Sequence, residues 1–441
     1  MKVVVAGAGV AGCVTAIGLR RLGYDVVMIN KPRTFEAYEG FSERTVDAIR
    51  RLGCPQALEA VGPLSPRSSL WNGVGREVNA EYLTFRPRFD AALLRDALAQ
   101  GVEVIEGSLV GAFGETQAGC TGWVKTAEGE CTVHGDAAVD ARGRFTPYAK
   151  AYTKGPQSYA LLQKFHIPEQ TVSHTTLHAT AKGWIWQAAI SGGTGYLQMA
   201  CRQETAQQVR TFAELLPLLD EEGGDLWVLH NARPDGELIR RDAYAKLHDD
   251  IVQKRIFQVG DAASSVDPLS GNGVFQALSM ATVLPSVIHT MLTRNETDGG
   301  TAAAFYRARV RDLFRRFCKT GRDFYRAETR YGDLFWEQRQ KWSVLSEVPD
   351  AIRIEERATI IYPFVERQRV VVTPENPNGV AFLEGVALVP VVECLTQCPP
   401  DERAAALRKI MQGIDTATSA RLLRWLRDHG MLGTPFSASV G

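Results

Sequence analysis

The chain has 441 residues, a length that suits two or three domains or one large composite domain. Basic and acidic residues both number 50, so the net charge is zero and gives no global electrostatic case for binding nucleic acid or an anionic membrane. The eight cysteines are widely scattered, and the N-terminus enters a predicted strand without a signal-peptide pattern, so we expect reduced thiols, no metal centre and a cytoplasmic protein.

The first predicted elements form a βαβ unit. Residues 2–6 predict a buried strand, 7–12 a glycine turn, 11–22 a helix and 24–29 a second strand. Further helices are predicted over 43–52 and 89–99, and further strands over 102–106, 123–126, 130–133 and 137–140. This order predicts an α/β domain that binds a dinucleotide.

The pattern changes between residues 155 and 250, where short strands rich in Thr, Trp and His predict an antiparallel sheet that forms one wall of a pocket. A helix is inserted over 211–219. A strand over 255–259 and a helix over 271–292 then return to the first domain. The apolar run 274–292 contains Gln276, Pro285 and His289, which favours an internal helix over a membrane span.

The remaining chain is predicted to contain one long or broken helix over 301–342 and two helices over 402–411 and 418–429. The predicted division is a discontinuous FAD-binding domain (1–65, 85–155 and 251–295), a substrate domain (66–84 and 156–250), a long helical segment (296–345) and a mostly helical C-terminal domain (346–441).

The glycine turn between the first strand and the first helix fits the pattern G-x-G-x-x-G, from Gly7 through Gly9 and Ala11 to Gly12. Gly7 permits a tight turn, Gly9 lets the backbone approach a pyrophosphate, and Gly12 lets the helix pack closely on the strand. The usual acid at the end of the second strand, which binds ribose hydroxyls, is replaced by Asn30. Its amide oxygen can still accept a hydrogen bond, but without charge.

Three further segments indicate FAD rather than NAD. Arg86 opens the segment before the helix at 89–99, residues 140–144 follow a buried strand, and Asp261 follows the strand at 255–259. A carboxylate at that strand end can bind ribityl hydroxyls. The N–H groups of the next helix can face the flavin edge that gains negative charge on reduction. The loop and helix start concerned contain Pro268, Gly271, Asn272, Gly273 and Val274.

These segments, in this order, resemble the flavin monooxygenase and flavin-dependent halogenase superfamily over roughly residues 1–345. The resemblance implies a glutathione-reductase-type, Rossmann-like FAD-binding domain with an inserted antiparallel-sheet substrate domain. It also implies that Arg86 reaches the FAD phosphates or ribityl chain and that Asp261 reaches the ribityl chain.

The segment around Trp184, Trp186 and Gln187 resembles the Trp-x-Trp segment of the halogenases, although Ala188 and Ala189 replace the family's Ile-Pro. Halogenases also need a lysine in the N-terminal third, and this chain has none between Lys31 and Lys125. We therefore favour hydroxylation of an aromatic ring by a flavin C4a-hydroperoxide formed from O₂.

The pocket for that ring is expected to be apolar and shielded from water. His174 and His178 fall in the same segment and, four residues apart on a strand, are expected to share a face. A proton relay and half-buried strand histidines are both open interpretations of this pair.

The segments 260–278 and 324–336, with the two tryptophans and the missing lysine, are most similar to a branch that modifies tryptophan within another protein. That branch includes the flavoprotein monooxygenase of tryptophylquinone biogenesis in quinohemoprotein amine dehydrogenase. The resemblance implies a tryptophan-containing protein partner, with NAD(P)H as electron donor either directly or through a separate flavin reductase. A small-molecule hydroxylase, a halogenase and a non-catalytic flavin-binding assembly factor remain alternatives.

Overall fold

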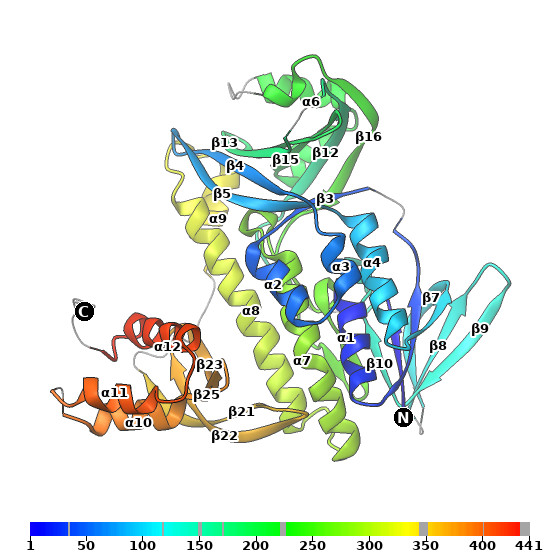
Figure 1. Ribbon diagram of the computed structural model, residues 1–441. Helices are drawn as coiled ribbons and strands as arrows, with labels where there is room; N and C mark the ends of the chain where they lie inside the picture. The colour runs from blue at the N-terminus through cyan, green and yellow to red at the C-terminus, as the bar shows by residue number, and fades with distance from the viewer. Residues whose placement is uncertain are drawn as a thin grey trace.

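The computed structural model describes residues 1–33, 36–116, 119–148, 152–169, 172–220, 226–343, 352–399 and 401–432. Figure 1 shows an N-terminal α/β body on the right, a large sheet above it, and a C-terminal part at the lower left. The helix α8 (Thr301–Arg326) crosses the molecule between them.

The α/β body is built on a six-stranded sheet in the order β18-β19-β10-β1-β2-β6. All neighbours are parallel except β18 and β19. The strands are β1 (Lys2–Ala6), β2 (Asp25–Asn30), β6 (Glu103–Glu106), β10 (Ala137–Asp140), β18 (Val252–Gln253) and β19 (Ile256–Gln258).

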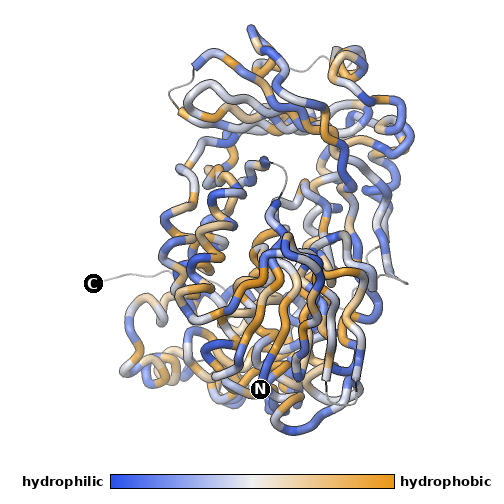
Figure 2. Tube along the Cα trace, turned by 90° about the vertical axis from the view of Figure 1, so that its right-hand side faces the viewer, coloured by the Kyte–Doolittle hydropathy of each residue, from blue (hydrophilic) through white to orange (hydrophobic). Residues whose placement is uncertain are grey.

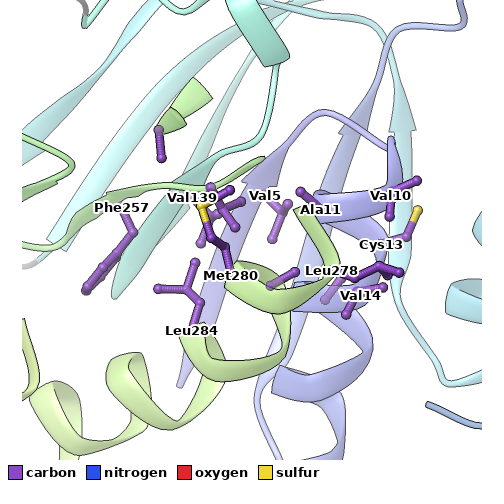
Figure 3. Packing of buried hydrophobic residues seen from close by; sticks show 14 of the residues in the cluster. Val5, Val10, Ala11, Cys13, Val14, Val139, Phe257, Leu278, Met280 and Leu284 are labelled. Atoms are coloured by element: carbon purple, nitrogen blue, oxygen red, sulfur yellow. The ribbon is translucent and has the colours of Figure 1, made fainter. Parts of the chain in front are cut away.

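Both faces of this sheet are covered, which explains why β1 is apolar at consecutive positions. Val3 and Val5 belong to the core formed with the helices, whereas Val4 and Ala6 pack under a three-stranded meander on the other face. Figure 3 shows Val5 and Val139 packed against the helices, and Figure 2 shows the hydrophobic strands gathered near the N-terminus. The covering elements are α1 (Val10–Arg21), α2 (Glu43–Arg51), α3 (Pro55–Glu59), α4 (Arg86–Ala99), α7 (Gly273–Thr293), β7 (Ser108–Thr116), β8 (Gly119–Lys125) and β9 (Glu130–Gly135).

Helix α7 is long and apolar enough to cross a membrane by length and composition. It packs between α1 and α8, and Leu278, Met280 and Leu284 are almost fully buried in the main core.

The large upper sheet has eight strands in the order β16-β12-β15-β14-β13-β4-β5-β3. Its neighbours are antiparallel except β13 and β4. The sequence predicts that residues 38–41 lie in the FAD-binding domain, but they form a strand that pairs with β5 in this sheet. The strands are β3 (Tyr38–Phe41), β4 (Leu64–Trp71), β5 (Val74–Phe85), β12 (Tyr159–His166), β13 (His174–Thr180), β14 (Gly183–Ile190), β15 (Thr194–Cys201) and β16 (Arg233–Asp242).

The two faces of the eight-stranded sheet have different neighbours. Helix α9 (Leu334–Lys341) packs against one face, which we call the near face. The far face packs against α5 (Gln203–Gln208) and α6 (Phe212–Asp220). A small sheet of β11 (Tyr152–Lys154), β17 (Lys246–His248) and β20 (Ser264–Ser265) connects the large sheet to the body.

The C-terminal part differs from the prediction of a mostly helical domain, because a three-stranded sheet and a two-stranded sheet precede its helices. Charged residues interrupt the apolar residues of both long strands and hide the strand pattern, as in RIEERATII and FVERQRVVVT. The elements are β21 (Arg353–Ile361), β22 (Phe364–Thr373), β23 (Asn376–Val380), β24 (Phe382–Leu383), β25 (Val386–Ala387), α10 (Leu388–Gln397), α11 (Arg403–Ile410) and α12 (Thr416–Asp428).

Candidate functional site

The glycine turn lies between β1 and α1, at the carboxyl edge of the parallel sheet. Gly7 has a φ of +106°, and a Cβ there would lie 2.6 Å from the carbonyl oxygen of Ala141. A Cβ at Gly12 would collide with the carbonyl oxygen of Gly7. At Gly9, by contrast, a Cβ would meet no atom within 4 Å. The turn therefore leaves open space beside Gly9 alone among its three glycines, as a bound pyrophosphate requires.

The N-termini of two helices lack a side-chain cap at this edge. Neither Gly9, which precedes α1, nor Asn272, which precedes α7, accepts a hydrogen bond from the first turn of its helix through a side chain. Cβ atoms added at Gly271 and Gly273 would also meet nothing within 4 Å. Uncapped N–H groups beside open space suit the anionic and electron-accepting parts of FAD.

The loop before α7 is shaped by Asp267 and Gly271. The Asp267 carboxylate accepts a hydrogen bond from the Leu269 N–H (2.9 Å), and Pro268 begins a short 3₁₀ turn. Gly271 ends that turn with a φ of +60°, a left-handed conformation that favours glycine. The sequence thus places Val274 and its neighbours in the first turn of α7, as predicted.

Arg44 of α2 belongs to the same site and was missed by the sequence reasoning. Its guanidinium donates a hydrogen bond to the Asn272 Oδ1 (3.3 Å) and lies 5.0 Å from the centre of the Phe275 ring. The partner is 228 residues away in sequence, so no local pattern singles Arg44 out.

Arg86 is held by two carboxylates. Its Nη1 donates to Glu39 (2.8 Å), and its Nε and Nη2 donate to Asp90 (3.1 and 2.9 Å). Arg33 also pairs with Asp90 at 3.2 Å. Burial alone would lower the pKa of Arg86, but the two carboxylates raise it above its ordinary value. Arg86 is therefore a fixed positive charge in a network in which two arginines alternate with two carboxylates.

Asp261 lies in a short 3₁₀ turn (Gly260–Ala262) after β19, and its side chain is 43% exposed. Its carboxylate lies 3.5 Å from the Nε of Arg144, which also donates a hydrogen bond to the Tyr244 carbonyl (3.0 Å). Partial desolvation by the surrounding protein raises the pKa of Asp261, and Arg144 opposes this shift. An acceptor held in this way suits hydroxyl groups such as those of a ribityl chain.

An aromatic wall on the near face of the large sheet adjoins the loop before α7. Trp184 is 3% exposed, and its Nε1 donates a hydrogen bond to the Tyr325 hydroxyl (3.0 Å). That hydroxyl donates to the Asp267 carboxylate, at 3.1 Å from each oxygen. Leu269 packs in the same cluster. The aromatic wall comprises Trp71, Trp184, Trp186, Tyr325, Tyr331, Phe335 and Trp336.

The aromatic wall contacts a charged group on one side, the guanidinium of Arg339, which lies 3.7 Å from the centre of the Phe335 ring. Burial raises the pKa of Asp267, and burial beside Asp267 raises the pKa of Tyr325 well above its ordinary value. The arrangement can present an apolar surface to an aromatic ring and exclude water from it.

His174, His178 and Gln187 lie on the far face of the sheet, away from Trp184 and Trp186. The register pairs His178 with Ile185, whose side chain belongs to the far-face core. Side chains alternate along a strand, so residues an odd number of positions from Trp184 in β14 point to the other side.

The contacts of His174 and Gln187 also place them on the far face. Gln187 accepts a hydrogen bond from the Val228 N–H (3.2 Å), and His174 stacks on Trp227 with 4.3 Å between ring centres. His174 also lines a separate cavity of about 330 Å³. The structure thus corrects the expectation that the two histidines and Gln187 line the same pocket as the tryptophans.

Comparison with known proteins agrees with this geometry. Residues 61–360 match the family model of tryptophan halogenase. The peptidyl tryptophan dihydroxylase QhpG, essential for tryptophylquinone cofactor biogenesis, is 35% identical, with a TM-score of 0.79 over 97% of this chain and 99% of QhpG. The flavin-dependent halogenase CmlS has the same fold at 18% identity, with a TM-score of 0.74 over 98% and 95% of the two chains.

A tryptophan 2-halogenase of Chondromyces crocatus is 26% identical over 370 residues, which span 77% of this chain and 70% of the halogenase. These findings confirm the resemblance inferred from the sequence motifs. The chain therefore belongs to the tryptophan halogenase family, within the superfamily of flavin-dependent halogenases and monooxygenases, and is an FAD-dependent enzyme.

Proposed function

We propose that this protein is an FAD-dependent monooxygenase that hydroxylates the ring of a tryptophan within a partner protein. The observation that carries the proposal is the correspondence with the peptidyl tryptophan dihydroxylase, which extends over 97% of the chain at 35% identity. That correspondence includes the C-terminal part, a surface that a protein substrate could use.

The residues that would hold FAD lie along one edge of the body. The turn from Gly7 to Gly12 and Asn30 would bind the adenosine diphosphate half. Asp261 would bind ribityl hydroxyls, and Arg86 would supply positive charge near the phosphates. The N-terminus of α7 would face the flavin ring. When bound and reduced, FAD supplies the reaction with O₂ that yields an oxygen atom for transfer.

The chain's own residues then position the substrate ring and exclude water. Trp184 and Trp186 share the near face with Leu177 and Ala179. Trp184 is covered by its neighbours in the aromatic wall, whereas Trp186 is only partly buried, so Trp186 offers the surface on which an indole would stack. The partly buried Asp267 carboxyl is held by Tyr325 and by the Leu269 N–H. Asp267 is an ionisable group within the loop that would contact the flavin.

Halogenation is the second candidate, favoured by the 26% identity to a tryptophan 2-halogenase. A halogenase needs a lysine amine to carry or activate hypohalous acid, and the sequence has no lysine between Lys31 and Lys125. We therefore prefer oxygen transfer.

The test uses the purified protein loaded with FAD, in chloride buffer with O₂. The flavin is reduced either by NAD(P)H alone or by a separate flavin reductase, which identifies the electron donor. Substrates are synthetic peptides with a single tryptophan, and free tryptophan is the control. Mass spectrometry that shows one or two added oxygen atoms on the peptide supports the proposal. A chlorine isotope pattern, or oxidation of free tryptophan alone, refutes it.

A further inference from the structure

The missing acid at the end of β2 is compensated by a neighbouring strand. Asn30 ends β2 and Glu106 ends β6, and the parallel register of the two strands sets these residues side by side. The Ile29 carbonyl accepts a hydrogen bond from the Gly7 N–H (2.9 Å), so Asn30 directly adjoins the phosphate-binding turn. Both side chains therefore stand where the adenosine ribose of FAD is expected.

The contact between the two side chains fixes the orientation of the amide. The Asn30 Nδ2 donates to both carboxylate oxygens of Glu106, at 2.9 and 3.1 Å. A carboxylate only accepts hydrogen bonds, so the NH₂ group must face Glu106 and Oδ1 must point away from it. The Asn30 backbone oxygen is occupied by the Gly107 N–H (2.9 Å), which further limits rotation of this residue.

The charge of Glu106 is not neutralised by the part of the chain that the structure describes, where it forms no ion pair, and its side chain is exposed. A negative charge beside a carboxamide polarises the amide and strengthens Oδ1 as an acceptor. The pair thus restores, over two strands, the acceptor and the charge that one acidic residue usually provides.

We propose that Glu106 is a positioning residue that orients Asn30, and that the pair holds the ribose hydroxyls of the adenosine half of FAD. The inference rests on the family's use of FAD and is independent of the substrate proposed above. A failure to find peptide hydroxylation would leave it untouched.

The experiment measures the dissociation constants of FAD and FMN for the apoprotein by flavin fluorescence. Glu106→Ala removes the orienting carboxylate and is expected to raise the dissociation constant of FAD about tenfold, the equivalent of one charge-assisted hydrogen bond. FMN lacks the adenosine, so its dissociation constant should not change. Glu103→Ala, at the exposed start of β6, is the matched control and should alter neither constant.

A second pair of variants tests the charge. Asn30→Glu alone sets two carboxylates side by side and is expected to weaken FAD binding. Asn30→Glu combined with Glu106→Gln exchanges the acid and the amide between the strands and should restore it. The inference is overturned if Glu106→Ala leaves FAD binding unchanged, if it weakens FAD and FMN equally, or if Asn30→Glu alone binds FAD as tightly as the wild type.

Discussion

The indole Nε1 of Trp184 donates a hydrogen bond to the hydroxyl of Tyr325, 141 residues away, at 3.0 Å. The same hydroxyl donates to Asp267 in the loop before α7. Three separate segments, β14, α8 and the loop, are thus joined through one buried oxygen atom. This links the wall that would contact the substrate ring to the loop that would contact the flavin.

Removal of the Tyr325 hydroxyl should weaken the attachment of both β14 and the loop before α7. Tyr325→Phe leaves Trp184 without its acceptor and Asp267 without one of its donors. The loss should cost about 1–3 kcal/mol because the indole N–H of Trp184 is buried and would be left without a partner. A double-mutant cycle with Trp184→Phe is expected to show a coupling of about 0.5–3 kcal/mol. Thermal or urea unfolding measures the stabilities. Strict additivity of the two substitutions would contradict the linkage.

The same variant should also release more hydrogen peroxide per reduced flavin, because a displaced wall admits water to the site. Peroxide assays on the FAD-loaded protein measure this leak. Tyr362→Phe, at a residue that is 70% exposed, serves as the control and should leave the yield unchanged.

Substitutions in the glycine turn can separate an effect on FAD binding from an effect on the stability of the fold. Gly9 has a φ of −79°, which alanine also adopts, and its Cβ would meet no protein atom. Gly9→Ala should therefore keep the melting temperature of the apoprotein, yet raise the FAD dissociation constant at least about tenfold by filling space beside the pyrophosphate. Gly12→Ala should instead destabilise the apoprotein, because its Cβ collides with backbone. Equal effects of both substitutions on the melting temperature would refute this interpretation.

Local sequence predicted the parts of the site whose chemistry is local. The strand, glycine turn and helix around Gly9, and the strand, Asp261 and loop before α7, were identified because turns and helix starts restrict residue types over a few positions. Alternation along a strand also predicted that Trp184 and Trp186 share a face, and they do.

The alternation of side chains along a strand shows which residues share a face of the sheet, but not which face lies towards the cofactor. For that reason His174 and Gln187 were expected in the flavin-side pocket and lie on the far face. Tyr325 and Arg44 act through partners 58 and 228 residues away, a pairing that only the tertiary fold creates. The C-terminal strands were missed because their charged residues hide the apolar alternation.

We expect the Asp261 carboxylate to lower the stability of the apoprotein while it strengthens the binding of FAD. Its pKa is raised in the folded protein, chiefly because the surrounding protein partly desolvates the carboxyl. A raised carboxyl pKa means that the folded state binds the proton more tightly than the unfolded state does. At neutral pH the carboxylate charge therefore lowers the free energy of unfolding. This loss of stability disappears as the pH falls through the folded-state pKa. Asp261→Asn should raise the melting temperature of the apoprotein at neutral pH, and this advantage should shrink as the pH is lowered towards the ordinary carboxyl range of about 4.

The same substitution should weaken FAD binding roughly ten- to hundredfold, because a charged acceptor for hydroxyl groups is lost. Calorimetry of the apoprotein and flavin fluorescence check the two effects on one preparation. A melting temperature that falls at neutral pH would contradict the proposed cost of the carboxylate charge.

His248 predicts a second, opposite pH dependence. It lies in β17, which pairs with the strand leading to Asp267, and burial followed by the charge of Lys246 lowers its pKa to about 4, while Asp249 and Asp140 oppose the shift. The unfolded chain binds this proton at the ordinary value near 6.5. Unfolding therefore takes up a proton between these values, so the stability associated with neutral His248 is full above about pH 6.5 and is lost as pH falls towards 4.

His248→Gln removes the titration but keeps a polar side chain of similar size. The stability of the variant relative to the wild type should rise by roughly 2 kcal/mol between about pH 7 and pH 5, because each tenfold difference in proton affinity between the folded and unfolded states corresponds to about 1.4 kcal/mol. Urea unfolding at a series of pH values measures this difference. Parallel pH profiles for the two proteins would show that His248 titrates normally in the folded state and that β17 is open to water.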